Sequence, residues 1–322
     1  MIPYELRIYR SAFSIYWHDM RSYLKFSSAY NRFDKPEKLK SFLTKTYHVV
    51  EKGLTMPQTR LGFGIENVKK LLELCTMYEI KGYDQTALEY SHSVNVLNEY
   101  VSFHEKNNFS IDPDVIDSVK LLTVKSGFTT ASQQKSVSKE DFFKNSKSSF
   151  DEFSQSRYTV RNFTPDDIPL ETLHHCVELA QRSPSPCNRQ PNRVYIIKDK
   201  ILMEEVFKLQ NGNRGFGHLG NALLVFTSDL SVFHDTYERN EMYLNSGMFS
   251  MSLIYALHFY KIGSCALNWS VPIHKDLALK KLLNIPDNEA VTLTLVCGYV
   301  PDEFKIALSP KLGWRPITTD LL

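Results

Sequence analysis

The stretch RSPSPCNRQPNRVYIIKD, residues 182–199, joins two kinds of secondary structure. Before it, Leu173, Cys176 and Ala180 recur at the spacing of one helix face. Its second half, RVYIIKD, is rich in β-branched and aromatic residues, which predicts a strand. The prolines of the connection stiffen it and reduce the entropy that is lost when it is fixed. Such a connection is more rigid and more polar than joining a helix to a strand requires.

Composition places the chain among soluble globular proteins. Its 322 residues are 43% hydrophobic and 23% charged, which is enough for a packed core and long enough for two domains. Lys and Arg number 38 against 36 acidic residues, and this balance argues against a nucleic-acid-binding protein. The five cysteines are scattered and form no CxxC pair, so we expect reduced thiols and no zinc site. No apolar stretch is long enough to span a membrane, and we expect a cytoplasmic location.

Three regions follow one another along the chain. Apolar residues at helical spacing predict helices over 66–80 and 90–101, so residues 1–125 are expected to form a helical N-terminal domain of unknown role. Residues 126–150 are rich in Ser, Lys and Gln and are expected to be a linker. Helical and strand patterns then alternate, which predicts a mixed domain over 151–322. Its expected helices include 203–210, 241–260 and 275–285, and its expected strands include 193–199, 222–230 and 290–300.

Three motifs suggest functions that their context does not support. GFGHLG at 215–220 fits a dinucleotide-binding pattern, but a helix precedes it and a strand follows, so we interpret it as a loop. His174 and His175 point in different directions on a helix, and we expect a solvated face with Cys176 packed inward rather than a metal site. His48, Glu51 and Lys52 are interpreted as polar side chains at a helix end, with a catalytic role as the alternative.

The segment RYTVR, residues 157–161, is the first with a specific chemical meaning. In an extended chain, Arg157, Thr159 and Arg161 point to one side. Two guanidinium groups and a hydroxyl on one side suit a phosphate, because the guanidinium fork matches phosphate oxygens. An exposed edge with ordinary arginines is the alternative if the segment is taken alone.

Four motifs in order resemble the nitroreductase superfamily of FMN-dependent oxidoreductases. They are RYTVR at 157–161, PSPCNRQP at 184–191, GSCALN at 263–268 and WRP at 314–316. The resemblance covers about residues 151–322. It implies an α+β fold, in three layers, with a central, mainly antiparallel sheet flanked by helices, here preceded by the mostly helical N-terminal region. GSCALN corresponds to a turn after a long helix in this pattern.

The resemblance also implies a role for each matched residue. Arg157, Thr159 and Arg161 would hold the phosphate and ribityl chain of FMN, with Arg315 closing on the phosphate. The ring would be bordered by Ser185 and Pro186, hydrogen-bonded by Asn188, and lined on its other face by Ala266, Leu267 and Asn268. Gln190 would set the entry of the strand. Two departures are Asn192, where the family usually has an aromatic residue, and Tyr158, where it has a second Arg or a His.

The function implied is hydride transfer from NADH or NADPH through FMN to an electron-poor acceptor such as a nitro compound or a quinone. No catalytic side chain is needed, because the flavin carries the chemistry. The resemblance implies a homodimer with flavin at its interface, a small-molecule substrate and no metal. Two alternatives stay open: an FMN-dependent oxidase or dehydrogenase of a specialised metabolite, and a non-catalytic flavin-fold protein that binds a partner.

Overall fold

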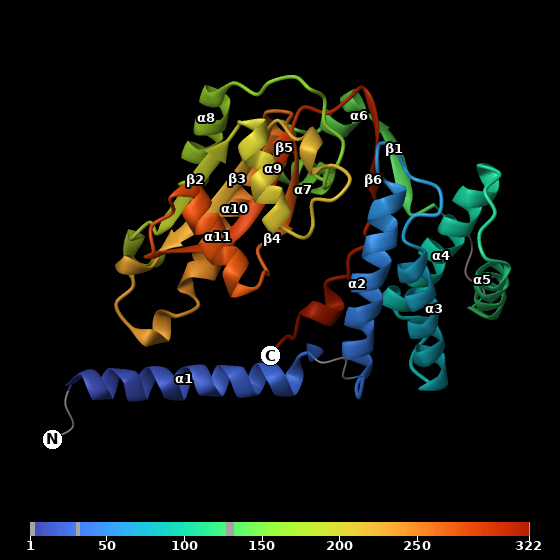
Figure 1. The fold of residues 1–322 in the computed structure, drawn as a ribbon, viewed down its shortest axis with the longest axis horizontal. Coiled ribbons are helices and arrows are strands. Elements are labelled where there is room, and N and C mark those ends of the chain that lie inside the picture. The colour runs from blue at the N-terminus through green and yellow to red at the C-terminus, as the bar shows by residue number, and fades with distance from the viewer. Residues whose placement is uncertain (1–3, 30–32, 127–131, 322) are drawn as a thin grey trace. The chain divides into compact units, whose positions relative to one another are not determined.

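The computed structural model of the chain describes residues 4–29, 33–126 and 132–321 (Figure 1). It separates into two compact units. One contains the residues up to Ile15 together with Ser136–Ile306, and the other contains Tyr16–Lys135 together with Ala307–Leu322. In the described residues, no helix is both long enough and apolar enough to cross a membrane.

The helical unit is built on α2 (Pro36–Leu54), α3 (Ile65–Ile80), α4 (Leu88–Lys106) and α5 (Pro113–Ser126). These helices confirm the predictions for 66–80 and 90–101, and the apolar stripe of each lies in one shared core. Tyr78, Tyr90 and Tyr100 are fully buried in that core, and the rings of Tyr78 and Tyr90 stack 5.3 Å apart. The buried Tyr100 hydroxyl donates to the Phe63 carbonyl oxygen at 2.8 Å, so its polar end is satisfied.

A separate helix, α1 (Tyr4–Phe26), precedes these four. Its apolar residues are largely exposed, in contrast to those of α2–α5.

The mixed unit has a four-stranded sheet with the order β2-β3-β5-β4. Its strands are β2 (Asn192–Ile197), β3 (Ala222–Asp229), β4 (Gly263–Asn268) and β5 (Glu289–Gly298), and each neighbouring pair is antiparallel. The two central strands are β3 and β5, and β3 is buried along nearly its whole length. A continuous apolar run such as ALLVF is expected where both faces of a strand are covered. The predicted antiparallel sheet is therefore confirmed.

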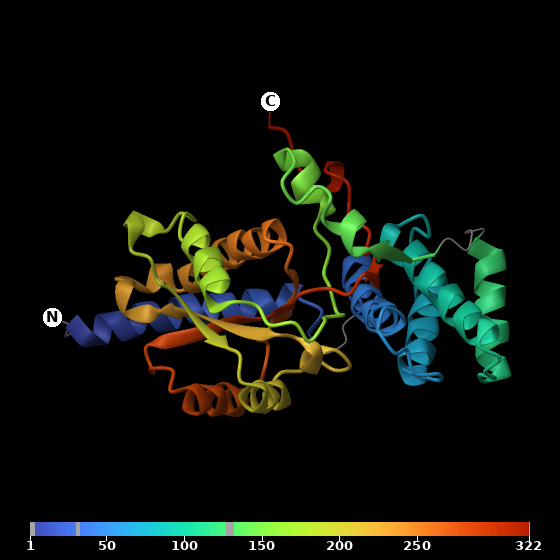
Figure 2. The same ribbon diagram turned by 90° about the horizontal axis from the view of Figure 1, so that it is seen from above.

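Helices cover both faces of this sheet (Figure 2). On one face, α8 (Leu170–Ala180) and α10 (Glu241–Phe259) pack against alternate residues of β3 and β5, including Leu224, Phe226 and Leu295. On the other face lie α9 (Lys200–Leu209) and α11 (Ile273–Leu283). This arrangement confirms the predicted three layers of helix, sheet and helix.

Residues 134–156 are ordered as short elements. They form β1 (Gln134–Ser138), α6 (Lys139–Phe143) and α7 (Phe150–Ser156), and β1 pairs with β6 (Glu303–Ala307). Phe142 and Phe143 are buried against other aromatic rings of the mixed unit. The predicted division at 125 and 150 therefore differs from the compact units, because residues 136–150 belong with the sheet and 307–322 belong with the helices. Residues 127–131 of the predicted linker lie outside the described residues.

GSCALN forms the edge strand β4, so the expectation of a turn was wrong. The segment pairs along its whole length with β5, from Gly263 opposite Gly298 to Asn268 opposite Leu293. This pairing is with residues far along the chain, and it overrides the turn preference of Gly and Ser.

Candidate functional site

The RYTVR segment is extended and is fixed beside the sheet by backbone hydrogen bonds. Val160 N donates to Ser264 O at 3.0 Å, and Thr164 N donates to Tyr299 O at 2.8 Å. The side chain of Asn221 donates to Thr164 O at 2.9 Å and accepts from Tyr299 N at 3.1 Å. The segment is therefore held at the first residues of β4 and just beyond the last residue of β5.

Arg161 is a buried cation without a hydrogen-bond partner for its Nε atom. Only 7% of its surface is exposed, and its guanidinium lies 5.9 Å from the centre of the Phe216 ring. Among the residues that the structure describes, no carboxylate forms an ion pair with it. Burying a guanidinium without an anion is costly, so this position is suited to an anionic ligand.

Arg157 is partly buried, and no carboxylate of the described residues forms an ion pair with it. Burial lowers its pKa, and the hydroxyl groups of Tyr255 and Tyr158 act in the opposite direction. Nearby, His258 is 2% exposed, and its Nε2 lies 2.8 Å from Ser156 Oγ. Burial, assisted by the charge of Arg157, lowers the pKa of His258 to about 4. The histidine is therefore neutral at pH 7, and the site keeps a net positive charge. Thr159, between the two arginines, is partly exposed.

The PSPCNRQP loop has an unusual backbone. Pro186–Asn188 form a 3-10 turn, and Cys187, Asn188 and Gln190 have φ values of 50°, 57° and 50°. Non-glycine residues rarely adopt this left-handed region, and the strain concentrates at functional sites when the surroundings enforce it. Here Ser185 contributes twice, because its carbonyl accepts from Asn188 N at 3.0 Å and its hydroxyl accepts from Gln190 N at 3.1 Å.

Arg189 holds this loop in place and was not identified from the sequence. Its Nε donates to Pro186 O at 3.0 Å and its NH1 donates to Val232 O at 2.8 Å. Both terminal nitrogens also bond to the carboxylate of Glu238. The Arg189 hydrogen bond, helped by the His234 backbone N–H, lowers the pKa of Glu238 to about 2, so the ion pair persists at any ordinary pH.

A small pocket lies beside the loop. It is lined by polar residues around one aromatic ring, namely Gln181, Ser183, Ser185, Gln190, Asn192, Arg193 and Phe249. The Ser183 hydroxyl is used internally, since it donates to Ser252 Oγ at 2.7 Å. Asn192 Oδ1 has no partner, and neither has the buried hydroxyl of Ser228, which lies opposite Asn192 in the sheet. Gln181, Ser183 and Phe249 were not predicted, because the first two lie in the turn that follows α8 and the third lies on α10.

The last residues of β4 present alternate side chains to solvent. Ala266 and Asn268 are exposed, whereas Leu267 is buried. Asn268 O accepts a hydrogen bond from Gln210 Nε2 at 3.0 Å, and its Oδ1 accepts from Ser270 N at 3.2 Å. Two of the three residues predicted to line a ring are therefore accessible from one face of the sheet, and Leu267 points to the other.

The predicted segments 157–161 and 185–191 fall at opposite ends of the sheet, and residues 266–268 pair with β5 between these ends. Arg161 neighbours Val160, which bonds to Ser264, and Ser264 pairs with Cys297 near the end of β5. The 185–191 loop leads into Asn192, whose neighbour across the sheet, Ser228, pairs with Ala290 at the start of β5. Seven residues of strand separate these ends, roughly 23 Å. In one copy of the chain the predicted residues thus form two separate groups, which we call the two half-sites of the predicted flavin site.

Arg315 belongs to the other compact unit. It begins a short 3-10 turn, is exposed, and has its guanidinium 5.7 Å from the Trp314 ring centre. Its predicted contact with a phosphate stays a prediction.

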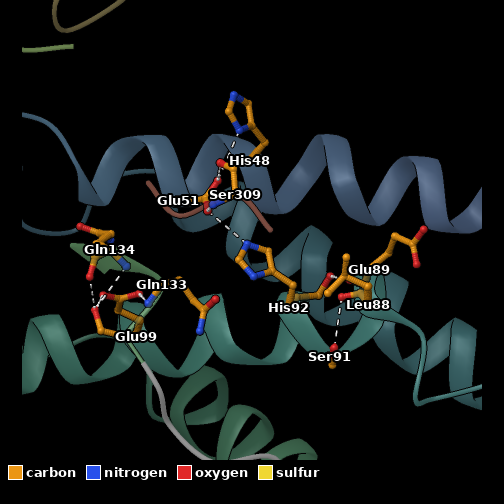
Figure 3. A network of polar contacts seen from close by, with 12 residues as sticks. His48, Glu51, Leu88, Glu89, Ser91, His92, Glu99, Gln133, Gln134 and Ser309 are labelled. Carbon is orange, nitrogen blue, oxygen red and sulfur yellow. Dashed lines mark hydrogen bonds and ion pairs between the residues drawn. The ribbon is translucent and has the colours of Figure 1, made fainter. Parts of the chain in front are cut away.

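Glu51, expected at a polar helix end, is fully buried within the helical unit (Figure 3). His92 Nε2 lies 3.1 Å from its Oε1, His48 Nδ1 lies 3.4 Å from its Oε2, and Ser309 Oγ donates to Oε2 at 3.0 Å. Burial alone would raise the pKa of Glu51, but the hydrogen bonds from His48 and His92 outweigh it and lower the pKa to about 2. The carboxylate joins α2, α4 and the C-terminal segment, so we assign it a structural role.

The other sequence motifs have the predicted local structure. GFGHLG is a loop with a 3-10 turn at Gly217–Leu219, and it supplies Phe216 beneath Arg161. His174 and His175 are exposed on α8 while Cys176 is buried. All five cysteines are free thiols, and the described residues contain no cluster suited to a metal ion.

Comparison with known proteins identifies a family for one part of the chain. Residues 155–299 match the model of the nitroreductase family. An iodotyrosine deiodinase of Nematostella vectensis is 21% identical over 205 residues, which are 55% of this chain and 76% of that protein. An iodotyrosine dehalogenase 1 homologue of Caenorhabditis elegans is 21% identical over 194 residues, 52% of this chain and 59% of that protein.

Two solved structures of nitroreductase family proteins are also similar. The one from Streptococcus pneumoniae has a TM-score of 0.46 at 18% identity and covers 53% of this chain and all of its own. The one from Clostridium novyi has a TM-score of 0.43 at 17% identity and covers 48% of this chain and 86% of its own.

Proposed function

Residues 155–299 are a nitroreductase-family domain, and on this premise we propose that the protein is an FMN-dependent oxidoreductase that takes its electrons from NADH or NADPH. The observation that carries this proposal is Arg161, a buried guanidinium with an unpaired Nε and no acidic partner among the described residues. A ligand phosphate would supply the missing anion. The residues present therefore fit FMN, with Arg157, Thr159 and Arg161 as the phosphate-binding group.

The bound flavin would accept a hydride equivalent from the reduced nicotinamide and pass two electrons to the acceptor. For a quinone, NAD(P)H and one proton are consumed, and the hydroquinone and NAD(P)⁺ are formed. The chain's own contribution is placement. The strained 185–191 loop presents the side chains of Ser185 and Asn188, while Ala266 and Asn268 leave an open surface at the end of β4.

The two half-sites support a homodimer as the working form. A five-carbon ribityl chain is shorter than the roughly 23 Å between the ends of the sheet, so one copy does not offer both halves to one flavin. A twofold axis would place the Arg157–Arg161 end of one copy next to the 185–191 loop of another. Each flavin would then be held by two copies of the chain.

Reductive dehalogenation is a second candidate, favoured by the curated relatives, which are iodotyrosine deiodinases and a dehalogenase homologue. In that reaction an aryl iodide takes up two electrons and one proton, and the arene and iodide are released. The polar pocket with its unpaired Asn192 Oδ1 offers an acceptor for a phenol or an amine of such a substrate.

Anaerobic reduction tests the proposal. The FMN-loaded protein is mixed with NADH or NADPH while flavin absorbance is followed, and a quinone, a nitroarene or 3-iodotyrosine is then added. Bleaching by a nucleotide followed by reoxidation with the quinone or nitroarene supports the oxidoreductase. Reoxidation only by 3-iodotyrosine, with release of iodide, favours the dehalogenase. Bound flavin that neither nucleotide reduces would count against the proposal and favour an oxidase or a binding protein.

A further inference from the structure

The helix α1 carries an apolar repeat that none of the functions above uses. Six apolar side chains alternate at spacings of three and four residues, namely Leu6, Tyr9, Phe13, Tyr16, Met20 and Tyr23. This is the a/d pattern of a heptad repeat, continued from Leu6 to Tyr23. In the figures α1 is one continuous helix (Figure 1).

All six side chains of this seam are exposed in a single copy of the chain. Their exposed fractions run from 44% for Met20 to 72% for Tyr9. Monomeric proteins rarely leave a contiguous apolar patch of several hundred Å² in contact with water. Large side chains exposed to this degree contribute about 100 Å² each, so the seam offers roughly 600 Å² per helix, near the ~800 Å² per partner of a standard interface.

The side of the helix opposite the seam is largely polar. Arg7, Ser14, His18, Arg21 and Lys25 are exposed there, whereas Ile8 on the same side and Trp17 and Phe26 beside the seam add exposed apolar surface. An apolar stripe with a polar reverse side is what a helix needs when one side only is covered.

The spacing indicates what covers the seam. Apolar residues that recur every 3.5 residues on average form a stripe that keeps facing a second helix wound around the first. The side chains then pack as knobs into holes. A lipid surface requires a broad apolar face but imposes no such repeat. We propose that α1 pairs through this seam with α1 of a second copy of the chain, as a two-helix coiled coil. The pairing does not depend on flavin binding.

The proposal is tested by placing charged residues in the seam of the full-length protein. One variant carries Tyr9→Lys with Tyr16→Lys, and another carries Tyr9→Glu with Tyr16→Glu. The readout is amide hydrogen exchange of α1 followed by mass spectrometry, which reports on this helix whether or not the rest of the chain associates. Exchange in α3 and α4 serves as the internal reference for folding.

In the wild type, we expect α1 amides to exchange about tenfold more slowly than in either charged variant alone. An equal mixture of the Lys and Glu variants should regain slow exchange, because opposite charges then face each other across the seam. A control with Ser14→Lys and His18→Lys, which adds lysines on the polar side, should match the wild type.

Three results would overturn the proposal. Exchange in α1 could be equally fast in the wild type and the seam variants, or the mixture could stay fast. The wild type could also become protected only when vesicles of anionic phosphatidylglycerol are added, which would assign the seam to a membrane surface.

Discussion

Arg189 and Glu238 form a two-pronged ion pair across 49 residues of sequence, and this pair fixes the most strained loop of the nitroreductase domain. Arg189 also bonds to the carbonyl of Pro186, the first residue of the 3-10 turn. Cys187, Asn188 and Gln190 keep their left-handed conformations because the Arg189 interactions and the Ser185 hydrogen bonds hold the backbone around them. We regard Arg189 as a residue that positions the proposed flavin-binding loop without contacting flavin.

Replacement of Arg189 by Ala should therefore weaken FMN binding about tenfold, because the loop must be ordered again at each binding event. Glu238→Ala should have a similar effect, and FMN affinity measured by fluorescence quenching checks both. Lys208→Ala removes an exposed ion pair with Glu205 on α9 and is the matched control. Equal FMN affinity in Arg189→Ala and the control would show that the Arg189–Glu238 ion pair does not contribute to FMN binding.

The proposal that two copies of the chain hold each flavin predicts that two variants, each defective in a different half-site, restore FMN binding when they are mixed. Arg161→Gln disables one half-site, and Asn188→Gly disables the other while keeping the left-handed backbone at low cost. Each variant alone should bind little FMN. When the two are mixed and allowed to exchange subunits, half of the dimers are mixed, and each has one intact site, so about a quarter of all sites should recover. No recovery, despite demonstrated exchange of subunits, would place the whole site within one copy.

His258 predicts a dependence of stability on pH. Its pKa is lowered to about 4 from an ordinary value of 6.5, so between these values the unfolded chain binds more protons than the folded one. Its contribution to stability is therefore present above pH 6.5 and is lost as pH falls toward 4. The loss is on the order of 2–3 kcal/mol in the free energy of unfolding.

Denaturant titrations at pH 7 and pH 4.5 check this prediction, with His258→Gln as the comparison. Glutamine keeps an acceptor for Ser156 but cannot take up the proton. The difference in unfolding free energy between the two pH values should be smaller in the variant. An equal difference in both proteins would mean that another group controls the acid sensitivity. Glu51 acts at lower pH, because its contribution is lost only from about 4.5 to about 2.

Gly298 leaves room for Phe163 and Asn221, which lie beside the segment that follows RYTVR. A Cβ atom at this position would lie 2.4 Å from Asn221 Oδ1 and 2.9 Å from Phe163 Cβ. Asn221 is the side chain that ties Thr164 to the sheet. Gly298→Ala should cost about 1–3 kcal/mol in unfolding free energy and also weaken FMN binding.

Gly247→Ala is the matched control for that substitution. Gly247 lies inside α10, and beyond its two chain neighbours and the backbone of the helix itself nothing lies within 4 Å of an added Cβ. Alanine is there expected to stabilise by about 0.5–1 kcal/mol, because it favours the helix. If both glycine variants unfold at the same denaturant concentration, the close packing around Gly298 does not matter for stability.

Much of the domain could be predicted because its signals are local. The apolar periodicity of 66–80 and the β-branched runs of 222–230 and 290–300 correspond to α3, β3 and β5. The RYTVR and PSPCNRQP motifs likewise identified an extended segment and a rigid turn before a strand. In each case neighbouring residues in sequence determine the structure.

The rest depends on contacts between distant residues, which leave no local pattern. GSCALN has the composition of a turn, and only its pairing with β5 makes it a strand. The sequence around Arg189 does not predict its pairing with Glu238. Likewise, the sequence around Glu51 does not predict its buried contacts with His92 and Ser309. The separation of the two half-sites likewise follows from strand order, which the motifs do not contain.

Titration of the flavin-free protein with FMN tests the central claim most directly. Quenching of flavin fluorescence should saturate at one FMN per chain. Arg161→Gln should weaken binding by about 10- to 100-fold, the effect of losing a charge-assisted hydrogen bond to phosphate. Arg182→Gln, an exposed arginine at the end of α8, should bind like the wild type. Failure of the wild type to bind FMN, or equal affinity in the Arg161 and Arg182 variants, would contradict the account.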